Sequence, residues 1–285
     1  MFNSKRLDRY VATALERHRI YKKKMNHDQR PWTEDPILDK FRFCNIFRQY
    51  DKCSLWMINN IVRKSRNLEQ LWPAVIAYRY ISSYNMYKEL ANRCVDLFDM
   101  KQVHSTMIDI VHEGMKFNGC FLRNPKIKGG WSPIVHVPFL LIREIRVDGR
   151  LPSVVSRQSF ENLTKYLIQF SATSGFMAHQ YACDLEYSVF FDPTDKQTYA
   201  TMGPGSKQGM NLLLDRNRKA PMKQDEWLKY ARELRTFLAE AFKWEFPEEE
   251  ISMQDVQNWL CEFQKYSKYL TMEKTGVRVK VRKYP

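Results

Sequence analysis

The segment SGFMAHQYACDLEYS brings a histidine, an amide and a carboxylate close together in the chain. If the segment is helical, Gln180 and Asp184 are four residues apart and project from one side. A carboxylate in a cleft can act as a general base, and a Gln or His beside it can read the edge of a base extruded from DNA. We therefore predict Asp184, His179 and Gln180 as catalytic residues. The alternative is an aspartate that bridges helices in the core, beside a histidine bonded to a backbone carbonyl.

A second segment, KFRFCNIFRQYDK, places two arginines and an asparagine at intervals of three residues. On a helix, Arg42, Asn45 and Arg48 would share one side. Two guanidinium groups flanking an amide suit a multiply charged phosphate or pyrophosphate, because each guanidinium can bind two oxygens. We predict an anion site here. The alternative is a solvated basic face between core aromatic residues.

The third segment, GPGSKQG, is predicted to be a turn between two helices. Glycines permit positive φ angles and a close approach of backbone N–H groups to a phosphate. Helix-hairpin-helix proteins use such turns to bind one DNA strand without reading its sequence. The predicted DNA-binding residues are Gly203, Gly205, Ser206, Lys207, Gln208 and Gly209. The alternative is an ordinary helix connection, and Met210 after the last glycine excludes a P-loop.

Helices must position these segments. Apolar residues recur at helical spacing over residues 5–25, 37–50, 54–62, 74–84, 85–98, 103–115, 156–170, 175–187, 224–243 and 252–270. Ser54 is expected to cap its helix and Pro73 to lie in the first turn of the next. Glycines and prolines break residues 117–152, which we predict as an irregular insert with short strands at 134–137 and 139–142.

The sequence thus predicts a mostly α-helical fold. We expect residues 1–285 to form one helical domain, either as a single body or as two lobes sharing a cleft. Residues 1–36 are expected to be a basic N-terminal helix and loop, and residues 271–285 a basic C-terminal tail.

The charge balance favours a polyanionic partner. Forty-six Lys and Arg residues against thirty-two Asp and Glu residues give a net charge of +14, which attracts nucleic acid first. The alternative is a basic protein that is merely soluble. The six cysteines lack metal-binding spacing, so we predict reduced thiols and no metal. No signal peptide or long apolar run is visible, so we predict a soluble, cytoplasmic protein without a membrane partner.

Four segments taken together resemble a known family. In order, RFCNIFRQYDK, GFMAHQYACDLEY, GPGSKQGMN and WLCEFQKY resemble the α-glutamyl/putrescinyl thymine pyrophosphorylases, also described as amino acid:DNA transferases. The same helical domain occurs fused to 5-hydroxymethyluracil DNA kinases. The resemblance covers roughly Phe41 to Tyr269, and it implies a fold similar to the helix-hairpin-helix DNA glycosylases.

The resemblance implies a reaction on double-stranded DNA of a virus such as a bacteriophage. A 5-hydroxymethyluracil DNA kinase pyrophosphorylates the modified thymine, and this family replaces the pyrophosphate with an amine or amino acid, without a cofactor. On this basis Arg42, Asn45 and Arg48 would bind the pyrophosphate, and Asp184 would accept the amine proton. Arg123, Lys126 and Lys128 would bind the carboxylate of an amino acid donor.

Two other functions remain open at this point. Glycosylases of this fold place the catalytic Asp after the hairpin, and Asp215 follows the glycine segment here. If Asp215 is the essential carboxylate, the chain could cleave the glycosidic bond of a modified base, or the transferase could use that position. Alternatively, the chain is a non-catalytic DNA-binding partner of a base-modifying enzyme, which would bind DNA in a salt-dependent way.

Overall fold

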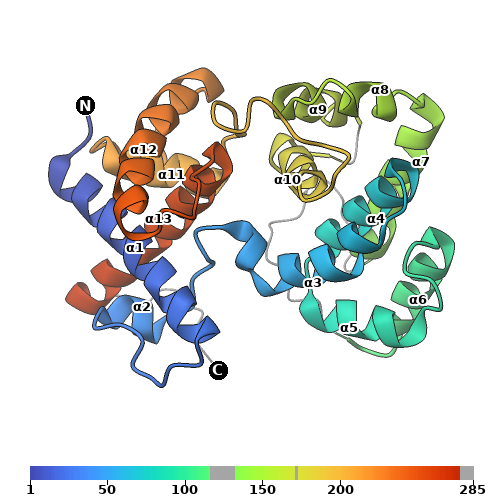
Figure 1. The fold of residues 1–285 in the computed structure, drawn as a ribbon, viewed down its shortest axis with the longest axis horizontal. Helices are drawn as coiled ribbons and strands as arrows, with labels where there is room; N and C mark the ends of the chain where they lie inside the picture. Colours follow the sequence, from blue (N-terminus) through green and yellow to red (C-terminus); the bar gives the residue numbers. More distant parts are fainter. Residues whose placement is uncertain (116–131, 171–172, 277–285) are drawn as a thin grey trace. The chain divides into compact units, whose positions relative to one another are not determined.

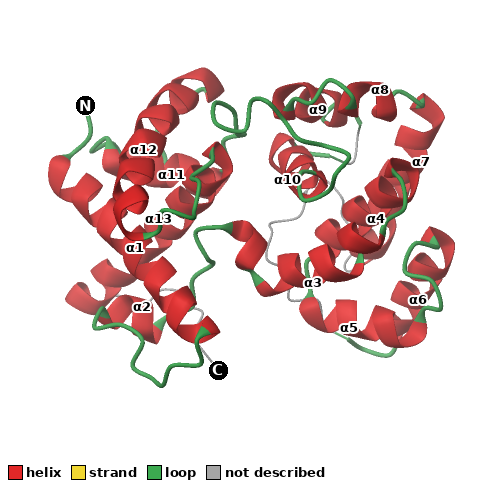
Figure 2. Cartoon of the chain, in the orientation of Figure 1, coloured by secondary structure: helices red, strands yellow, loops and turns green. Residues whose placement is uncertain are grey.

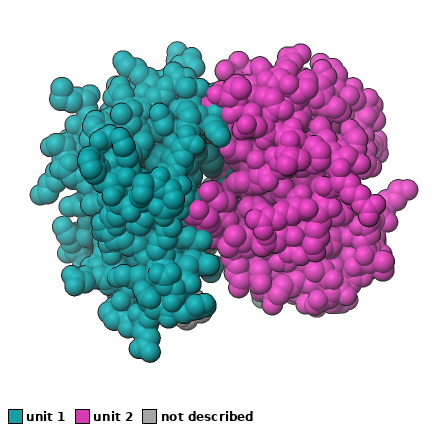
Figure 3. Space-filling view, viewed as in Figure 1, with its two compact units in different colours: residues 1–48, 196–285 teal, residues 49–195 magenta. Residues whose placement is uncertain are grey.

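The computed structural model describes residues 1–115, 132–170 and 173–276. Within these ranges the chain forms thirteen α-helices, two 3-10 helices and no strand. Figures 1 and 2 show the helices and the loops that join them. The chain divides into two compact units (Figure 3). Unit 1 combines residues 1–48 and 196–285, and unit 2 is the continuous stretch 49–195. No helix within the described ranges combines the length and the apolar character that crossing a membrane requires.

Unit 1 is built from both ends of the chain. Its helices are α1 (Ser4–Met25), α2 (Pro36–Lys40), α11 (Pro204–Leu213), α12 (Gln224–Glu245) and α13 (Met253–Thr275). Asn3 caps α1, and three lysines in its last turn complement the helix dipole. Ser252 and Asp255 form a capping box at the start of α13. Buried Trp259 joins α13 to α1 by donating a 3.0 Å hydrogen bond to the carbonyl of Tyr10.

The contact between α11 and α13 depends on two glycines of the predicted turn. Gly205 and Gly209 lie inside α11, one turn apart. A Cβ atom at Gly209 would lie 2.2 Å from the backbone oxygen of Leu260, and one at Gly205 would lie 2.3 Å from Sγ of Cys261. Real carbon atoms do not approach this closely. The glycines therefore allow the two helix backbones to pack against each other.

Unit 2 is organised around two buried helices, α4 (Leu68–Ile81) and α10 (Gly175–Leu185). Around them lie α3 (Lys52–Asn60), α5 (Tyr84–Arg93), α6 (Met100–His112), α7 (Ser132–Asp148), α8 (Leu151–Val155) and α9 (Phe160–Leu167). The 3-10 helices are η1 (Arg48–Tyr50) and η2 (Val62–Lys64). Almost every residue of α4 and α10 is buried, which explains why neither sequence shows a polar face.

The helices predicted over 5–25, 175–187, 224–243 and 252–270 are confirmed with small shifts at their ends. The predicted insert is wrong for its second half, because residues 132–148 form α7 rather than irregular chain with strands. Its β-branched residues are buried at helical spacing, as Val135, Ile142 and Ile145 show. Pro133 lies in the first turn, where helices tolerate proline. Residues 116–131 lie outside the described part.

Three further boundary predictions are wrong. Asp51, not Ser54, precedes α3. Pro73 lies inside α4, which begins five residues earlier behind the cap Asn67. The helix predicted over 156–170 is shorter, because α9 spans only Phe160–Leu167, and Gln158 before it has a φ of +48°. Asp195, distant in the sequence, accepts hydrogen bonds from the first backbone N–H groups of α9.

Candidate functional site

The predicted catalytic carboxylate lies in the core of unit 2. Asp184 is fully buried on α10 and forms a bidentate ion pair with Arg79 of α4, whose side chain is 4% exposed. Arg79 Nη2 donates to Asp184 Oδ1 at 2.6 Å, and Arg79 Nε donates to Oδ2. Arg79 Nη2 also donates to Ser54 Oγ of α3 at 3.2 Å. The pair thus ties three helices of unit 2 together.

The ion pair keeps Arg79 charged. Burial by itself lowers the pKa of a guanidinium, but the charge of Asp184 and its hydrogen bonds outweigh that effect, so the pKa of Arg79 is raised. Two opposite charges that share two hydrogen bonds in a buried place stabilise each other, and removal of either one leaves a costly unpaired charge.

His179 and Gln180 share this core with Asp184. Both are buried on α10, so the predicted helix and its four-residue spacing are confirmed. His179 Nε2 lies 3.6 Å from Sγ of Cys183, and its ring meets Phe160 edge-on at 5.3 Å between centroids. The three predicted catalytic residues are thus brought together in unit 2. Their catalytic roles stay predictions.

The helical arrangement predicted for Arg42, Asn45 and Arg48 is wrong. Helix α2 ends at Lys40, and Phe41 is already extended, with φ −116° and ψ 147°. The next helical turn, η1, begins only at Arg48. Arg42 is exposed, whereas Asn45 and Arg48 are 7% and 4% exposed. The aromatic residues on either side of Arg42 explain the extended path, because Phe41 and Phe43 both enter the core beside Tyr269.

Arg42 instead belongs to a group of basic side chains in unit 1, which we call the cationic cluster. It consists of Arg17, Lys24, Arg30 and Arg42. Arg17 is only 5% exposed, and its Nη2 donates to the carbonyl oxygen of Phe43 at 3.2 Å. Its Nε and Nη1 atoms are buried and have no hydrogen-bond partner among the described residues. Such donors normally have partners, which makes Arg17 unusual.

Lys24 and Arg30 meet at the ring of Trp32. The Nζ atom of Lys24 lies 4.4 Å from the ring centroid, and the Cζ atom of Arg30 lies 4.7 Å from it. The Trp32 ring itself is held by a 2.8 Å hydrogen bond from its Nε1 to the carbonyl oxygen of Asp28. Cation–π contacts of this kind stabilise positive charge next to an indole. Trp32 therefore holds two of the four cations together.

The proximity of the four cations changes the ionisation of Lys24. The pKa of Lys24 is lowered to about 8. Burial is the largest cause, and three neighbouring guanidinium groups add to it, those of Arg17, Arg30 and Arg42. Asp39 of α2 acts in the opposite direction. Cationic groups therefore outnumber acidic ones among the charges that shift the pKa of Lys24.

Arg17, Lys24 and Arg30 were not among the predicted pyrophosphate-binding residues. A signal was present for two of them. Arg17 and Lys24 are seven residues apart, and Tyr10, seven residues before Arg17, is buried on the same side of α1. An arginine on the apolar side of an amphipathic helix is unusual unless it has a partner. Arg30 lies in a loop and carries no such signal.

The glycine segment does not form the predicted turn between helices. Gly203 caps α11 and Gly205 to Gly209 lie within it, while residues 198–203 before it are not helical. The hydroxyl of buried Ser206 accepts the N–H of Gly203 at 2.9 Å. Contact of DNA with Lys207, Gln208 and the N-cap residue Gly203 remains a prediction. The predicted amine-binding residues Arg123, Lys126 and Lys128 lie outside the described residues.

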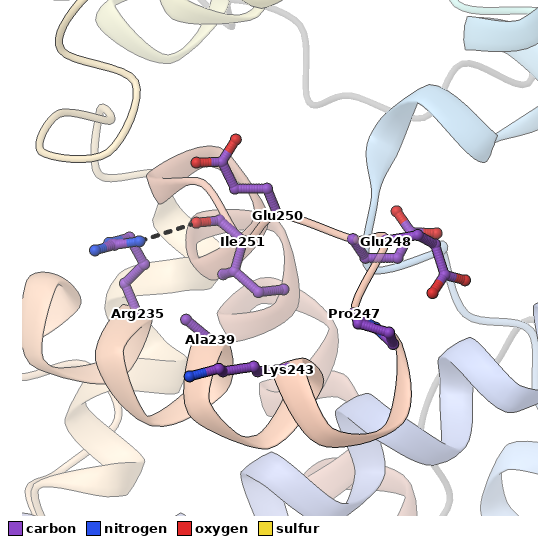
Figure 4. A pocket seen from close by; sticks show the side chains of 8 residues that line it. Arg235, Ala239, Lys243, Pro247, Glu248, Glu250 and Ile251 are labelled. Carbon is purple, nitrogen blue, oxygen red and sulfur yellow. Dashed lines mark hydrogen bonds between the residues drawn. The ribbon is translucent and has the colours of Figure 1, made fainter.

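The alternative carboxylate, Asp215, is exposed, whereas Asp184 is buried. It follows α11 with φ +58°, its side chain is 64% exposed, and it pairs with Arg6 at 2.7 Å. A different part of unit 1 carries a small pocket of about 230 Å³ beside α12 (Figure 4). There Arg235 donates to the carbonyl oxygen of Ile251 at 3.2 Å. The pocket contains none of the predicted site residues.

A further ion pair lies on α13. Glu262 and Lys265, one turn apart on α13, form an ion pair, and Glu262 also accepts the backbone N–H of Cys44 at 2.8 Å. The cysteines of the described ranges are free thiols. Within those ranges no three His, Cys, Asp or Glu side chains are grouped to hold a metal ion.

Comparison with known proteins identifies the family. The model of the family "5-hmdU DNA kinase, helical domain" matches residues 4–276. A 5-hmdU DNA kinase of Bacillus phage SP10 is 20% identical over 94% of this chain, and the chain spans 46% of that kinase. No solved structure matches the chain. The match to the family model runs through nearly every described helix of both units, and the chain therefore belongs to the family of 5-hmdU DNA kinase helical domains.

Proposed function

We propose that this chain is a transferase that modifies a thymine derivative in DNA. It would replace the pyrophosphate of 5-pyrophosphomethyl-deoxyuridine with an amine. The observation that carries the proposal is the cationic cluster of unit 1, in a chain that belongs to a family named for DNA kinases of 5-hmdU. A departing pyrophosphate carries several negative charges, and grouped guanidinium and ammonium groups stabilise that charge best.

The reaction requires three functions of the protein. The amine nitrogen forms a bond to the methylene carbon on C5 of the base, while the bond from that carbon to the pyrophosphate oxygen breaks. The pyrophosphate leaves with the electron pair, and the amine releases a proton. The chain must bind the leaving group, hold the extruded base and accept that proton.

The proposed roles follow the predicted residues. Arg42, with Asn45 and Arg48, binds the pyrophosphate. His179 and Gln180 orient the base and Asp184 accepts the proton. In the structure both oxygens of Asp184 accept hydrogen bonds from Arg79. Each of these oxygens has a second lone pair, which would accept the proton.

Further contacts complete the proposal. The start of α11, from Gly203 through Lys207 and Gln208, holds phosphates of the DNA strand. The basic residues Arg123, Lys126 and Lys128 bind the carboxylate of an amino acid donor, which favours an amino acid over a polyamine. A fold similar to helix-hairpin-helix DNA glycosylases is part of this proposal and is supported by the resemblance of the segments, not by the geometry of residues 203–209.

The test is a transfer assay with the purified full chain. A duplex that carries 5-pyrophosphomethyl-deoxyuridine is incubated with a pool of amino acids and polyamines, digested to nucleosides and analysed by mass spectrometry. We expect an aminated nucleoside and one released pyrophosphate per modified base. A duplex with 5-hydroxymethyl-deoxyuridine serves as control and should give neither. Abasic sites would instead identify a glycosylase, and an unchanged duplex would exclude the transferase.

One observation favours a second candidate. The family is named for kinases of 5-hmdU in DNA. The second candidate is a non-catalytic DNA-binding partner of a kinase that acts on 5-hydroxymethyl-deoxyuridine. In that case, adding the chain to such a kinase and ATP would increase phosphorylation of the duplex, while the chain alone would produce no new nucleoside.

A further inference from the structure

We infer that Arg17, with Lys24, Arg30 and Arg42, forms a binding site for a compact phosphate group with two or more negative charges, such as pyrophosphate. Arg17 is its buried anchor. The identity of the natural ligand rests on the proposed function, but the site itself can be tested without any transfer reaction.

The argument begins with the unused donors of Arg17. One of its three nitrogen atoms donates to the Phe43 carbonyl oxygen, next to Arg42 in the chain, and the other two are buried without a partner in the described residues. A buried donor without a partner costs free energy on folding, more when it is charged. An anion accepting from both atoms would remove this cost. The geometry of a guanidinium suits two phosphate oxygens.

The surrounding cations belong to separate elements that converge on this place. Lys24 comes from the same side of α1, Arg30 from the loop after it, and Arg42 from the extended segment after α2. The cation–π contacts with Trp32 hold Lys24 and Arg30 close to each other. Four positive charges brought together from three segments repel one another unless an anion joins them.

The charged groups that shift the pKa of Lys24 are mostly cationic. Three of them are guanidinium groups, those of Arg17, Arg30 and Arg42, and one is acidic, that of Asp39. A bound anion would lower the repulsion between these cations.

The arrangement favours a compact phosphate over the backbone of DNA. Contacts to a DNA strand require cations spread along the strand, because successive phosphates are several ångströms apart. Here three cations act on a fourth, and one of the three is 5% exposed. A small, multiply charged group suits cations gathered around one lysine better than a chain of singly charged phosphates does.

The site predicts a specific pH dependence. The free protein holds Lys24 at a pKa of about 8, and a bound anion would raise that pKa. Affinity should therefore be constant below pH 8 and fall as the pH rises above it, because the free site then loses the Lys24 charge. The groups facing Lys24 are Arg17, Arg30, Arg42 and Asp39. Lys24→Met should bind more weakly and lack this fall, apart from the titration of the ligand itself.

The experiment is calorimetric titration of inorganic pyrophosphate into the full chain. Arg17→Met keeps the length of the side chain and removes its charge. We expect this change to weaken binding by about ten- to hundredfold. Lys229→Met removes one exposed charge from α12 of the same unit and should change affinity by less than about twofold. Equal affinities of Arg17→Met and the unmodified chain would overturn the inference.

Two further measurements distinguish the site from misfolding and from general DNA binding. Arg42→Gln changes an exposed side chain, so its loss of pyrophosphate affinity cannot result from misfolding; unchanged affinity would contradict the site. An unmodified DNA duplex should bind the Arg17→Met variant and the unmodified chain alike, and loss of DNA binding with intact pyrophosphate binding would refute the compact ligand. Pyrophosphate binding without any transfer product would leave the site intact and exclude the transferase.

Discussion

At the scale of single residues, the pair of Arg79 and Asp184 is the feature on which interpretation of unit 2 depends. Its charges are buried, mutually bonded and contributed by helices far apart in the sequence. A carboxylate held in this way fixes the positions of helices, whether or not it also takes part in a reaction. Loss of activity on mutation of Asp184 therefore has two possible physical origins, which stability measurements separate.

Replacement of Asp184 by Asn should destabilise the chain strongly, because the guanidinium of Arg79 is then buried without its counter-charge. We expect a loss of about 3–5 kcal/mol in the free energy of unfolding, measured by urea denaturation. The double replacement Arg79→Met with Asp184→Leu removes both charges and should recover most of this loss. If Asp184→Asn unfolds at the same urea concentration as the unmodified chain, the pair contributes little. A stable double variant without transfer activity would support a chemical role for the carboxylate.

At the scale of helices, the two glycines of α11 decide how closely it packs on α13. Their positions suggested a DNA-binding turn, yet they lie inside a helix that begins at Pro204. In an exposed helix, replacing Gly by Ala usually stabilises by about 0.5–1 kcal/mol. Here the carbon added at Gly209 would meet the backbone of α13, and the carbon added at Gly205 would meet the side chain of Cys261.

We predict that Gly209→Ala destabilises the chain by about 1–3 kcal/mol, because its Cβ would lie 2.2 Å from the Leu260 oxygen. Gly205→Ala should also destabilise, but there the obstacle is a side chain, Sγ of Cys261. Adding Cys261→Ala should therefore restore stability to Gly205→Ala and not to Gly209→Ala. Thermal unfolding measures both. A higher melting temperature for Gly209→Ala would show that the helices are not this close.

At the scale of the whole molecule, the net charge of +14 belongs to a chain of two compact units. Positive charge alone does not identify a nucleic-acid site. The contribution of positive charge to DNA binding is measured by how the affinity changes with salt concentration, because each neutralised phosphate releases bound counterions.

We expect DNA affinity to fall linearly on a plot of log K against log salt, with a slope of about −0.9 for each phosphate contact. Lys207→Gln should make the slope less steep by about one contact. The control Lys229→Gln, a lysine on the exposed side of α12, should leave it unchanged. Fluorescence anisotropy at several salt concentrations measures the slopes. A slope near zero would mean that binding does not use phosphate contacts.

Much of this molecule follows from local sequence. The long amphipathic helices α1, α12 and α13 were predictable, as was α10, because their periodicity and caps involve residues within a few positions of one another. The α-helical class follows from the same patterns. Local patterns gave the wrong prediction for α7, which is rich in β-branched residues and contains proline. The helical spacing of its buried residues becomes visible only once the segment is assumed to be a helix.

The tertiary structure alone decided which polar groups are buried and beside what. Asp184 could be singled out by type and spacing, but its partner Arg79 is 105 residues away. The cationic cluster likewise joins Arg17 of α1 to a segment that leaves the helical path at Phe41. Periodicity and capping depend on neighbours along the chain. Desolvation and charge pairing depend on neighbours in space, which only the folded chain brings together.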